Sequence, residues 1–199
     1  MKRGGVVGIP TDTIYGLAAC AFDHKAVRRV FDVKGRPDSM PMPLLLADTA
    51  DSHRCVEQDV PEVAIRLAER FWPGALTLVL KRSAAIPDIV SAGGDTVALR
   101  VPNHPVPRLL ADGLGAPITG TSANRSGEPG LTTADAVKDV FKDGVDLVID
   151  AGEIPGGVAS TVLDLSGGRP VLVRQGAVSV KDIEAVLGAN ITIETRPIS

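Results

Sequence analysis

Residues 6–15, which read VVGIPTDTIY, place a short apolar run directly before a polar loop. The run at 6–9 is rich in β-branched residues and ends at Pro10, which is typical of a buried strand. The polar residues at 11–15 then follow the carboxyl end of that strand, where open α/β sheets commonly bind their ligands. This stretch therefore predicts a sheet protein whose functional site is built from loops that follow strands.

Along the rest of the chain, apolar runs of strand length alternate with helical patterns. Strands are predicted at 42–47, 76–80, 96–101, 118–121, 147–149, 161–165 and 171–174. Helices are predicted after the cap Asp23, after Pro61, and at the capping-box pairs Thr132/Asp135 and Ser179/Asp182. This alternation predicts one α/β (α+β) domain over residues 1–188, with helices flanking one mixed sheet. Residues 189–199 are predicted to form a C-terminal tail.

Composition limits the classes of function. The 199 residues are 44% hydrophobic and 23% charged, and the net charge of −3 gives no general attraction to nucleic acid or anionic membranes. Four Phe, one Trp and one Tyr are too few for a base-stacking surface, which disfavours an RNA-stacking module. Cys20 and Cys55 have no CxxC spacing, so no disulfide framework is predicted. The N-terminal apolar run is too short for a signal peptide or membrane span, so a cytoplasmic location is expected.

Several familiar catalytic signatures are missing from the sequence. The chain has neither a GxxxxGK[ST] loop nor a GxGxxG turn between a strand and a helix. Residues 120–124 resemble a nucleophile elbow, but Asn124 replaces its last glycine and no histidine follows Ser122. The three histidines are scattered without metal-binding spacing. The sequence therefore predicts neither a serine hydrolase nor a protein-held metal.

Cations and hydroxyls gather instead at loop positions that follow predicted strands. In an extended KGRP segment, Lys34 and Arg36 point to the same side, so both can face one anion such as a phosphate chain. An exposed basic helix end remains the alternative for these two residues. The other candidates are Thr11, Asp12, Thr13, Tyr15, Ser122, Asn124, Ser126, Ser160, Thr161 and Arg174. Together they predict one hydroxyl-lined pocket for an anion.

Six segments occur in a fixed order: PTDTIYGL (10–17), KGRP (34–37), WPGALT (72–77), TSANRSG (121–127), STVLD (160–164) and RQG (174–176). This ordered set resembles the YrdC-like family of L-threonylcarbamoyladenylate synthases, in its short, single-domain form. The resemblance implies a twisted sheet curled around a deep basic cavity. It also implies a nucleotidyltransferase that joins L-threonine, bicarbonate and ATP into threonylcarbamoyl-AMP and pyrophosphate. The product serves the formation of N6-threonylcarbamoyladenosine (t6A) in tRNA.

The same resemblance implies roles for nine residues. Lys34 and Arg36 would be catalytic, holding the phosphates and the carboxylated amine of threonine. The nucleotide would also be held by Thr96, Ser122, Asn124 and Arg174, and threonine by Thr13, Arg100 and Ser160. ATP would be a substrate, and Mg²⁺ accompanying its phosphates is left open. The implied partners are downstream t6A-transfer proteins and, weakly, tRNA.

Three positions depart from the family pattern, and two other functions stay in view. Met40, Leu45 and Gly130 stand where family members commonly carry polar residues, which predicts weaker affinity for the nucleotide and the amino acid. The second hypothesis is an RNA-binding module that holds tRNA or double-stranded RNA on the rim of a basic cavity. The third is carbamoyl-adenylate chemistry with another acceptor, as in YrdC-like modules of hydrogenase-maturation proteins.

Overall fold

Two β-sheets organise the protein in a computed structural model that describes residues 1–57, 60–154, 157–188 and 193–195. The strands are β1 (Val7–Ile9), β2 (Gly16–Ala18), β3 (Leu44–Leu45), β4 (Leu76–Lys81), β5 (Thr96–Arg100), β6 (Ile118–Thr119), β7 (Thr121–Ser122), β8 (Leu147–Val148), β9 (Thr161–Asp164), β10 (Val171–Arg174) and β11 (Glu194–Thr195). Within the described residues, one sheet has the order β7-β2-β1-β8 and the other β11-β10-β9-β4-β5-β3-β6. The predicted α/β class and the mixture of parallel and antiparallel pairs are confirmed. The prediction of one sheet is wrong.

A short segment around Gly120 joins the two sheets. The sequence predicts one strand at 118–121, but the structure divides it into β6 and β7, which belong to different sheets. Only glycine fits at this junction, because a Cβ at Gly120 would lie 2.6 Å from Leu45 Cγ. β6 also bonds to the chain just beyond β2, where Thr119 N donates to Ala19 O at 2.9 Å. The two sheets therefore meet along this segment.

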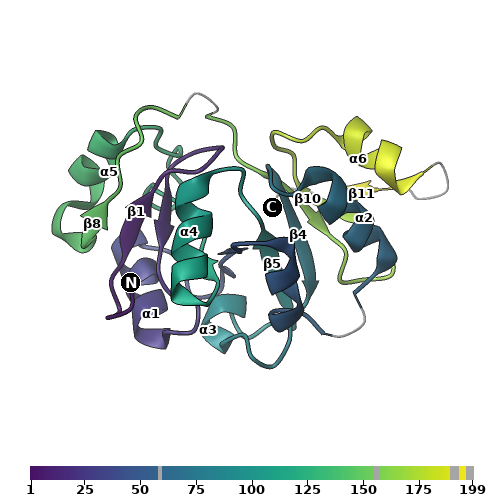
Figure 1. Cartoon of the computed structure of the whole chain (residues 1–199), viewed down its shortest axis with the longest axis horizontal. Helices are drawn as coiled ribbons and strands as arrows, with labels where there is room; N and C mark the ends of the chain where they lie inside the picture. Colours follow the sequence, from purple (N-terminus) through teal and green to yellow (C-terminus); the bar gives the residue numbers. More distant parts are fainter. Residues whose placement is uncertain (58–59, 155–156, 189–192, 196–199) are drawn as a thin grey trace.

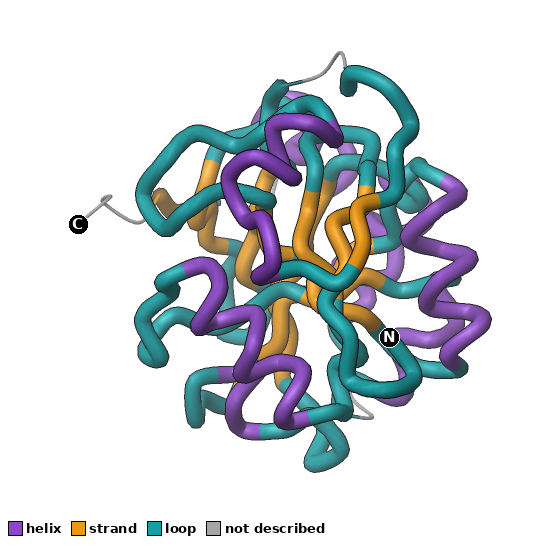
Figure 2. Tube along the Cα trace, turned by 90° about the vertical axis from the view of Figure 1, so that its left-hand side faces the viewer, coloured by secondary structure: helices purple, strands orange, loops and turns teal. Residues whose placement is uncertain are grey.

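Helices lie around the outside of the strands (Figure 2). They are α1 (His24–Lys34), α2 (Glu62–Phe71), α3 (Asp88–Ser91), α4 (Pro105–Leu114), α5 (Ala134–Phe141) and α6 (Val180–Leu187), with 3₁₀ turns η1 (Thr49–Arg54) and η2 (Lys142–Gly144). α5 contacts β1 and β8 at one end of the molecule, and α2 contacts β4 and α6 at the other (Figure 1). α4 lies between these ends and contacts β3 and β6. In the part of the chain that is described, no helix combines the length and apolarity needed to cross a bilayer.

Local capping signals predict the capping residues of α1 and α6 correctly, and place the cap of α5 one residue too early. Asp23 caps α1 by accepting hydrogen bonds from two backbone amides, and Ser179 caps α6 through the amide of Asp182, as predicted. α5 is capped by Thr133 Oγ1 rather than by the predicted Thr132. Thr133 has the extended backbone of a cap, with φ −128° and ψ 151°, and its hydroxyl accepts from the amide of Ala136 at 3.2 Å.

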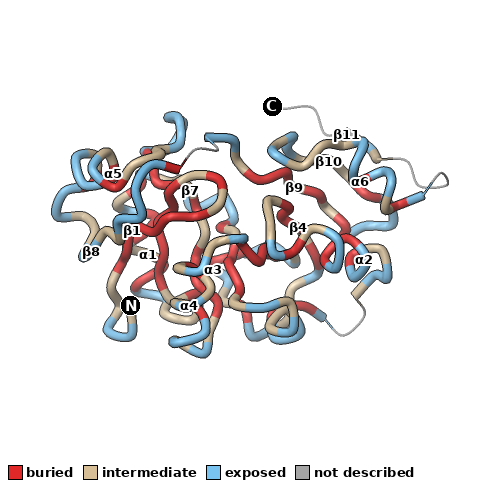
Figure 3. Tube along the Cα trace, turned by 45° about the horizontal axis from the view of Figure 1, so that its top comes forward, coloured by how far each residue is buried: buried red, intermediate tan, exposed pale blue. Residues whose placement is uncertain are grey.

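Most of the buried residues lie along the strands in the middle of the molecule (Figure 3). A large cluster spans both ends, and a smaller one contains Val7, Ile9, Ala18, Leu45, Ala111 and Ile118. At the C-terminal end, β11 adds to the seven-stranded sheet parallel to β10, with Glu194 N donating to Pro170 O. Residues 189–192 and 196–199 of the expected tail lie outside the described residues, and the boundary at 188 stays a prediction.

Candidate active site

Three of the predicted site residues lie together at one end of the central strands of the seven-stranded sheet. β4 and β9 run parallel and begin at this end, whereas β5 and β10 run in the opposite direction and finish there. Arg100 is the last residue of β5, Arg174 is the last of β10, and Ser160 directly precedes β9. The strand directions therefore bring residues that are far apart in the sequence to one place.

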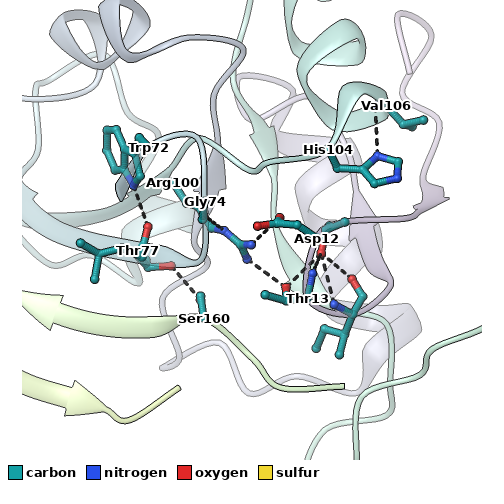
Figure 4. A network of polar contacts seen from close by, with 12 residues as sticks. Asp12, Thr13, Trp72, Gly74, Thr77, Arg100, His104, Val106 and Ser160 are labelled. Atoms are coloured by element: carbon teal, nitrogen blue, oxygen red, sulfur yellow. Dashed lines mark hydrogen bonds and ion pairs between the residues drawn. The ribbon is translucent and has the colours of Figure 1, made fainter. Parts of the chain in front are cut away.

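Arg100 is the centre of a network that reaches the other sheet (Figure 4). Its guanidinium donates from Nε to Gly74 O at 2.8 Å, from Nη1 to Thr13 Oγ1 at 3.1 Å, and from Nη2 to Asp12 Oδ1 at 2.5 Å. The side chains of Arg100 and Asp12 are 7% and 15% exposed. Burial lowers the pKa of Arg100, and the Asp12 charge acts in the opposite direction. The predicted threonine ligands Thr13 and Arg100 are thus in direct contact.

Asp12 is a candidate for the predicted pocket to which the sequence gives no ligand or role. It was available as a candidate in the polar loop, but no spacing rule pairs it with a cation 88 positions away. The loop is shaped by Thr11, whose Oγ1 accepts from the amides of Thr13 and Ile14 and donates to Ile14 O at 2.7 Å. A threonine that bonds its own turn in this way fixes the residues around it. Asp12 and Thr13 are consequently presented to Arg100.

Ser160 links Arg174 to the start of β4. The hydroxyls of Ser160 and Thr77 lie 2.9 Å apart, and Arg174 Nη2 donates to Ser160 O at 2.9 Å and to Ser160 Oγ at 3.1 Å. Burial lowers the pKa of Arg174, and the positive charge of Arg100 lowers it further. The charge of Arg100 therefore adds to the electrostatic cost of the charged Arg174, which an anion near both guanidiniums would reduce.

The turn that follows Arg174 is held by the buried hydroxyl of Thr161. Thr161 Oγ1 accepts from Gly176 N at 2.9 Å and Val178 N at 3.1 Å, and donates to Val178 O at 2.6 Å. A Cβ at Gly176 would lie 2.3 Å from Ala159 O, so the turn packs against the backbone before β9 only with glycine. These contacts hold the 174–176 segment next to Ser160.

Lys34 lies at the end of α1 and is bonded into a second group, near β7. Its Nζ donates to Ser122 O at 2.7 Å, to Asn124 O at 2.8 Å and to Asn124 Oδ1 at 3.0 Å. The residue is 2% exposed, and burial followed by repulsion from Arg36 lowers its pKa from 10.5 to about 8. The prediction that Lys34 forms an exposed basic helix end is therefore excluded. The structure brings Lys34, Ser122 and Asn124 together.

Arg36 follows α1 after the left-handed Gly35, whose φ is 64°. Its guanidinium donates to Met40 O at 3.2 Å and to Pro41 O at 2.7 Å. Burial lowers its pKa. These bonds to one short segment leave part of the guanidinium fork for a ligand, since Arg has five N–H donors.

Backbone contacts connect the network around Arg100 to the residues around Lys34, and Thr96 lies apart from both. Tyr15 N donates to Leu131 O and Ala123 N donates to Tyr15 O, which ties the loop of Thr13 to the loop of Asn124. Thr96 begins β5 opposite Lys81, whereas Arg100 ends it. Four strand steps separate them by about 13 Å. The assignment of Thr96 to the nucleotide stays a prediction.

The three departures from the family pattern lie in different surroundings. Leu45 is 3% exposed and packs in the smaller core cluster. At Gly130 a Cβ would lie 2.7 Å from Ile14 Cδ1, so a larger residue there would have to displace Ile14. Met40 is 42% exposed beside Arg36. Leu45 therefore takes part in packing, and the weaker affinity predicted from these three positions stays a prediction.

Two hollows between described residues lie away from the predicted cations. One of about 410 Å³ is lined by Ala47, Asp48, Pro105, Arg108, Leu109 and Asp112. The structure therefore does not show the expected deep basic cavity, which stays a prediction. Among the described residues, no three His, Cys, Asp or Glu side chains are grouped as metal ligands.

Comparison with known proteins gives consistent matches. A family model covering the Sua5, YciO and YrdC proteins, described as "Telomere recombination", matches residues 1–176. The threonylcarbamoyl-AMP synthase of Pyrococcus abyssi is 42% identical over 188 residues, which are 94% of this chain and 55% of that protein. The chain spans about half the length of the curated relatives it matches first.

Solved structures match over nearly the whole chain. The P. abyssi Sua5 structure complexed with L-threonine has a TM-score of 0.92 at 41% identity, covering 97% of this chain and 56% of that one. The Escherichia coli YciO structure has a TM-score of 0.82 at 31% identity, covering 92% of this chain and 88% of that one. The fold described above is therefore the fold of these proteins.

Proposed function

Because the chain belongs to the Sua5/YciO/YrdC family, we propose that it is a threonylcarbamoyl-AMP synthase. The proposed reaction condenses L-threonine, bicarbonate and ATP for t6A formation in tRNA. The observation that carries the proposal is the direct contact of Arg100 with Thr13, two predicted threonine ligands from different sheets. The threonine complex of the P. abyssi relative supports the same amino acid.

The chemistry requires positive charge more than a nucleophilic side chain. The threonine amine first forms a C–N bond with bicarbonate, which loses water. An oxygen of the resulting carboxylate then attacks the α-phosphorus of ATP, forming an O–P bond while the bond to pyrophosphate breaks. Both reactants are anions, so cations must offset their repulsion. Lys34, Arg36, Arg100 and Arg174 supply four cations, of which Asp12 neutralises one.

Threonine is assigned to the Arg100 network. The guanidinium would bind the threonine carboxylate, because an arginine fork and a carboxylate match in geometry. Thr13 offers a hydroxyl that contacts Arg100, and Ser160 offers one that contacts Arg174; both residues are buried, at 3% and 6% exposure. Buried hydroxyls that are already hydrogen-bonded hold fixed positions, which favours selection of one small polar side chain.

The nucleotide is assigned to the groups of Lys34 and Arg36, with Ser122, Asn124 and Arg174. Lys34 already donates three hydrogen bonds to the 122–124 segment. Lys34 would therefore act on the phosphates through its positive charge, and it also holds the 122–124 segment in place. Arg36 is partly open and supplies free N–H donors to the phosphates.

Cofactors and partners follow from this reaction. ATP is the proposed substrate, and Mg²⁺ would accompany its phosphates. The proposal includes the t6A-transfer proteins as receivers of the unstable product, a cytoplasmic location alongside the tRNA pool, and a weak contact with tRNA.

The decisive experiment measures pyrophosphate release from ATP, with threonine and bicarbonate omitted in turn and serine offered as a competitor. Release that requires both substrates is expected. Arg36→Ala should lower the rate by roughly 100-fold or more, because it removes a cation that stabilises developing charge. The same loss is expected for Lys34→Ala. The matched control is Arg66→Ala, which removes an exposed cation on α2 and should leave the rate unchanged.

Two outcomes would contradict the proposal. Release that does not depend on threonine would indicate another acceptor or simple nucleotide hydrolysis. Full activity in both Lys34→Ala and Arg36→Ala, with the fold intact by circular dichroism, would also contradict it.

A further inference from the structure

The ion pair between Asp12 and Arg100 has unused hydrogen-bonding capacity on both sides. Arg100 spends three of its N–H donors on Gly74 O, Thr13 Oγ1 and Asp12 Oδ1, which leaves two of five. Asp12 uses Oδ1 alone, and its Oδ2 makes no hydrogen bond to the residues that the structure describes. In that part of the chain, every side-chain nitrogen or oxygen sealed from solvent has a partner. Asp12 Oδ2 is therefore open to a group that arrives from solvent.

A carboxylate beside a guanidinium is complementary to both charges of an amino acid. An α-amino acid carries a carboxylate with two acceptors and an ammonium with three donors on adjacent carbons. The carboxylate can bind the remaining N–H donors of Arg100 while the ammonium binds Asp12 Oδ2. Hydrogen bonds between charged groups are the strong ones, and those in a mostly buried site are less screened by water.

We propose that Asp12 binds the ammonium of the amino-acid substrate, so that Asp12 and Arg100 together recognise the zwitterion. This inference rests on the proposed function for the identity of the amino acid, and adds Asp12 as a second charged contact. It predicts that molecules with only one of the two charges are poor ligands. It also gives the buried Arg100 a permanent partner in the absence of substrate, which avoids an unpaired internal cation.

The test compares ligands that differ in charge by isothermal titration calorimetry on the full chain. The probes are L-threonine, 3-hydroxybutanoate, which lacks the amine, and L-threoninamide, which lacks the carboxylate. The wild-type protein should bind threonine most tightly. In Asp12→Asn, threonine affinity should fall about 10- to 100-fold, the range for loss of one charged hydrogen bond. The affinity for 3-hydroxybutanoate should stay the same or rise, because the competing carboxylate on Arg100 is gone.

Two further variants separate binding from folding. Asp12→Glu keeps the carboxylate and should retain the preference for threonine over 3-hydroxybutanoate. Asp88→Asn breaks the Arg82–Asp88 ion pair elsewhere and should not change that preference. Thermal denaturation checks that each variant is folded. If Asp12→Asn does not fold, the test rests on Asp12→Glu. A folded Asp12→Glu protein that no longer prefers threonine over 3-hydroxybutanoate would overturn the proposal.

The outcomes distinguish this inference from the proposed function. Equal weakening of threonine and 3-hydroxybutanoate in Asp12→Asn, or no weakening of threonine, would overturn the role of Asp12 while leaving the synthase intact. Binding of serine or alanine but not threonine, with the same charge pattern, would support the zwitterion pair and contradict the substrate assignment. Binding of no amino acid by the wild-type protein would overturn both.

Discussion

Lys34 is a buried cation that loses its charge more easily than an ordinary lysine. Burial, with a further contribution from Arg36, lowers its pKa from 10.5 to about 8. As the pH rises through about 8, the charge assigned to the phosphates disappears. The ratio kcat/KM for ATP, which reports the free enzyme, is therefore expected to fall above pH 8 in the pyrophosphate assay. Binding of a non-hydrolysable ATP analogue should weaken over the same range.

The stability of the fold should respond to Lys34 in the opposite direction. Because the folded pKa lies below the unfolded one, the unfolded chain holds more protons between pH 8 and 10.5, so the free energy of unfolding contributed by Lys34 rises with pH there. The variant Lys34→Met tests the predicted pH dependence of ligand binding. Its binding of the ATP analogue should be weaker than that of the wild type and should no longer depend on pH in this range. If analogue binding by Lys34→Met still weakened above pH 8, another group would be responsible for the titration.

At the scale of single elements, α4 depends on an unusual cap. His104 Nδ1 accepts the amide hydrogen of Val106 at 3.2 Å, so the neutral ring carries its proton on Nε2 (Figure 4). Protonation of Nδ1 would break the cap. Burial lowers the pKa of His104, against the opposing charge of Asp12. The folded state thus binds a proton less readily than the unfolded chain.

The expected result is a loss of stability on acidification. As the pH falls below the ordinary histidine value of about 6.5, the unfolded chain gains a proton first, and the free energy of unfolding decreases. His104→Asn, which keeps a capping side chain that does not titrate, should flatten this decrease in urea denaturation between pH 7 and 5. His104→Ala should cost about 1 kcal/mol at pH 7. A decrease equally steep in His104→Asn would exclude His104 as its source.

Elements with local signals could be predicted from the sequence, and elements set by contacts elsewhere could not. Asp23 and Ser179 predict the starts of α1 and α6 because a cap is decided within three residues. The strand at 118–121 has a uniform local pattern, yet it changes sheets at Gly120, which packs against Leu45, 75 positions earlier. Strand pairing over such a distance leaves no mark in the local sequence.

The same limit applies to the site at the scale of the whole molecule. Lys34, Ser122 and Asn124 were predicted for one ligand, and the structure joins them by hydrogen bonds. The resemblance to a family supplied that grouping, since no periodicity relates residues 90 positions apart. The Asp12–Arg100 pair was not predicted, because it forms only when a loop of one sheet meets a strand end of the other. The site is thus a product of how the two sheets meet.

Gly120 offers a direct test of that junction. A Cβ there would lie 2.6 Å from Leu45 Cγ and 2.8 Å from Leu45 Cδ2, too close for the leucine to avoid by moving only its end. Gly120→Ala should therefore lower the free energy of unfolding by about 1–3 kcal/mol, the usual cost of overpacking. It should also weaken threonine binding, since the proposed ligands Thr13 and Arg100 come from different sheets. Urea denaturation followed by the fluorescence of the single Trp, the buried Trp72, measures the first effect.

The matched control is Gly113→Ala, where an added Cβ meets nothing within 4 Å on α4. Alanine favours a helix over glycine by up to about 1 kcal/mol, so this variant should be as stable as the wild type or more so. Its threonine affinity should be unchanged. The two substitutions add the same methyl group, and only one adds it between the sheets. If both variants unfold at the same urea concentration, close packing at Gly120 does not hold the sheets together. A destabilised Gly120→Ala with normal threonine affinity would instead show that the site tolerates movement of one sheet against the other.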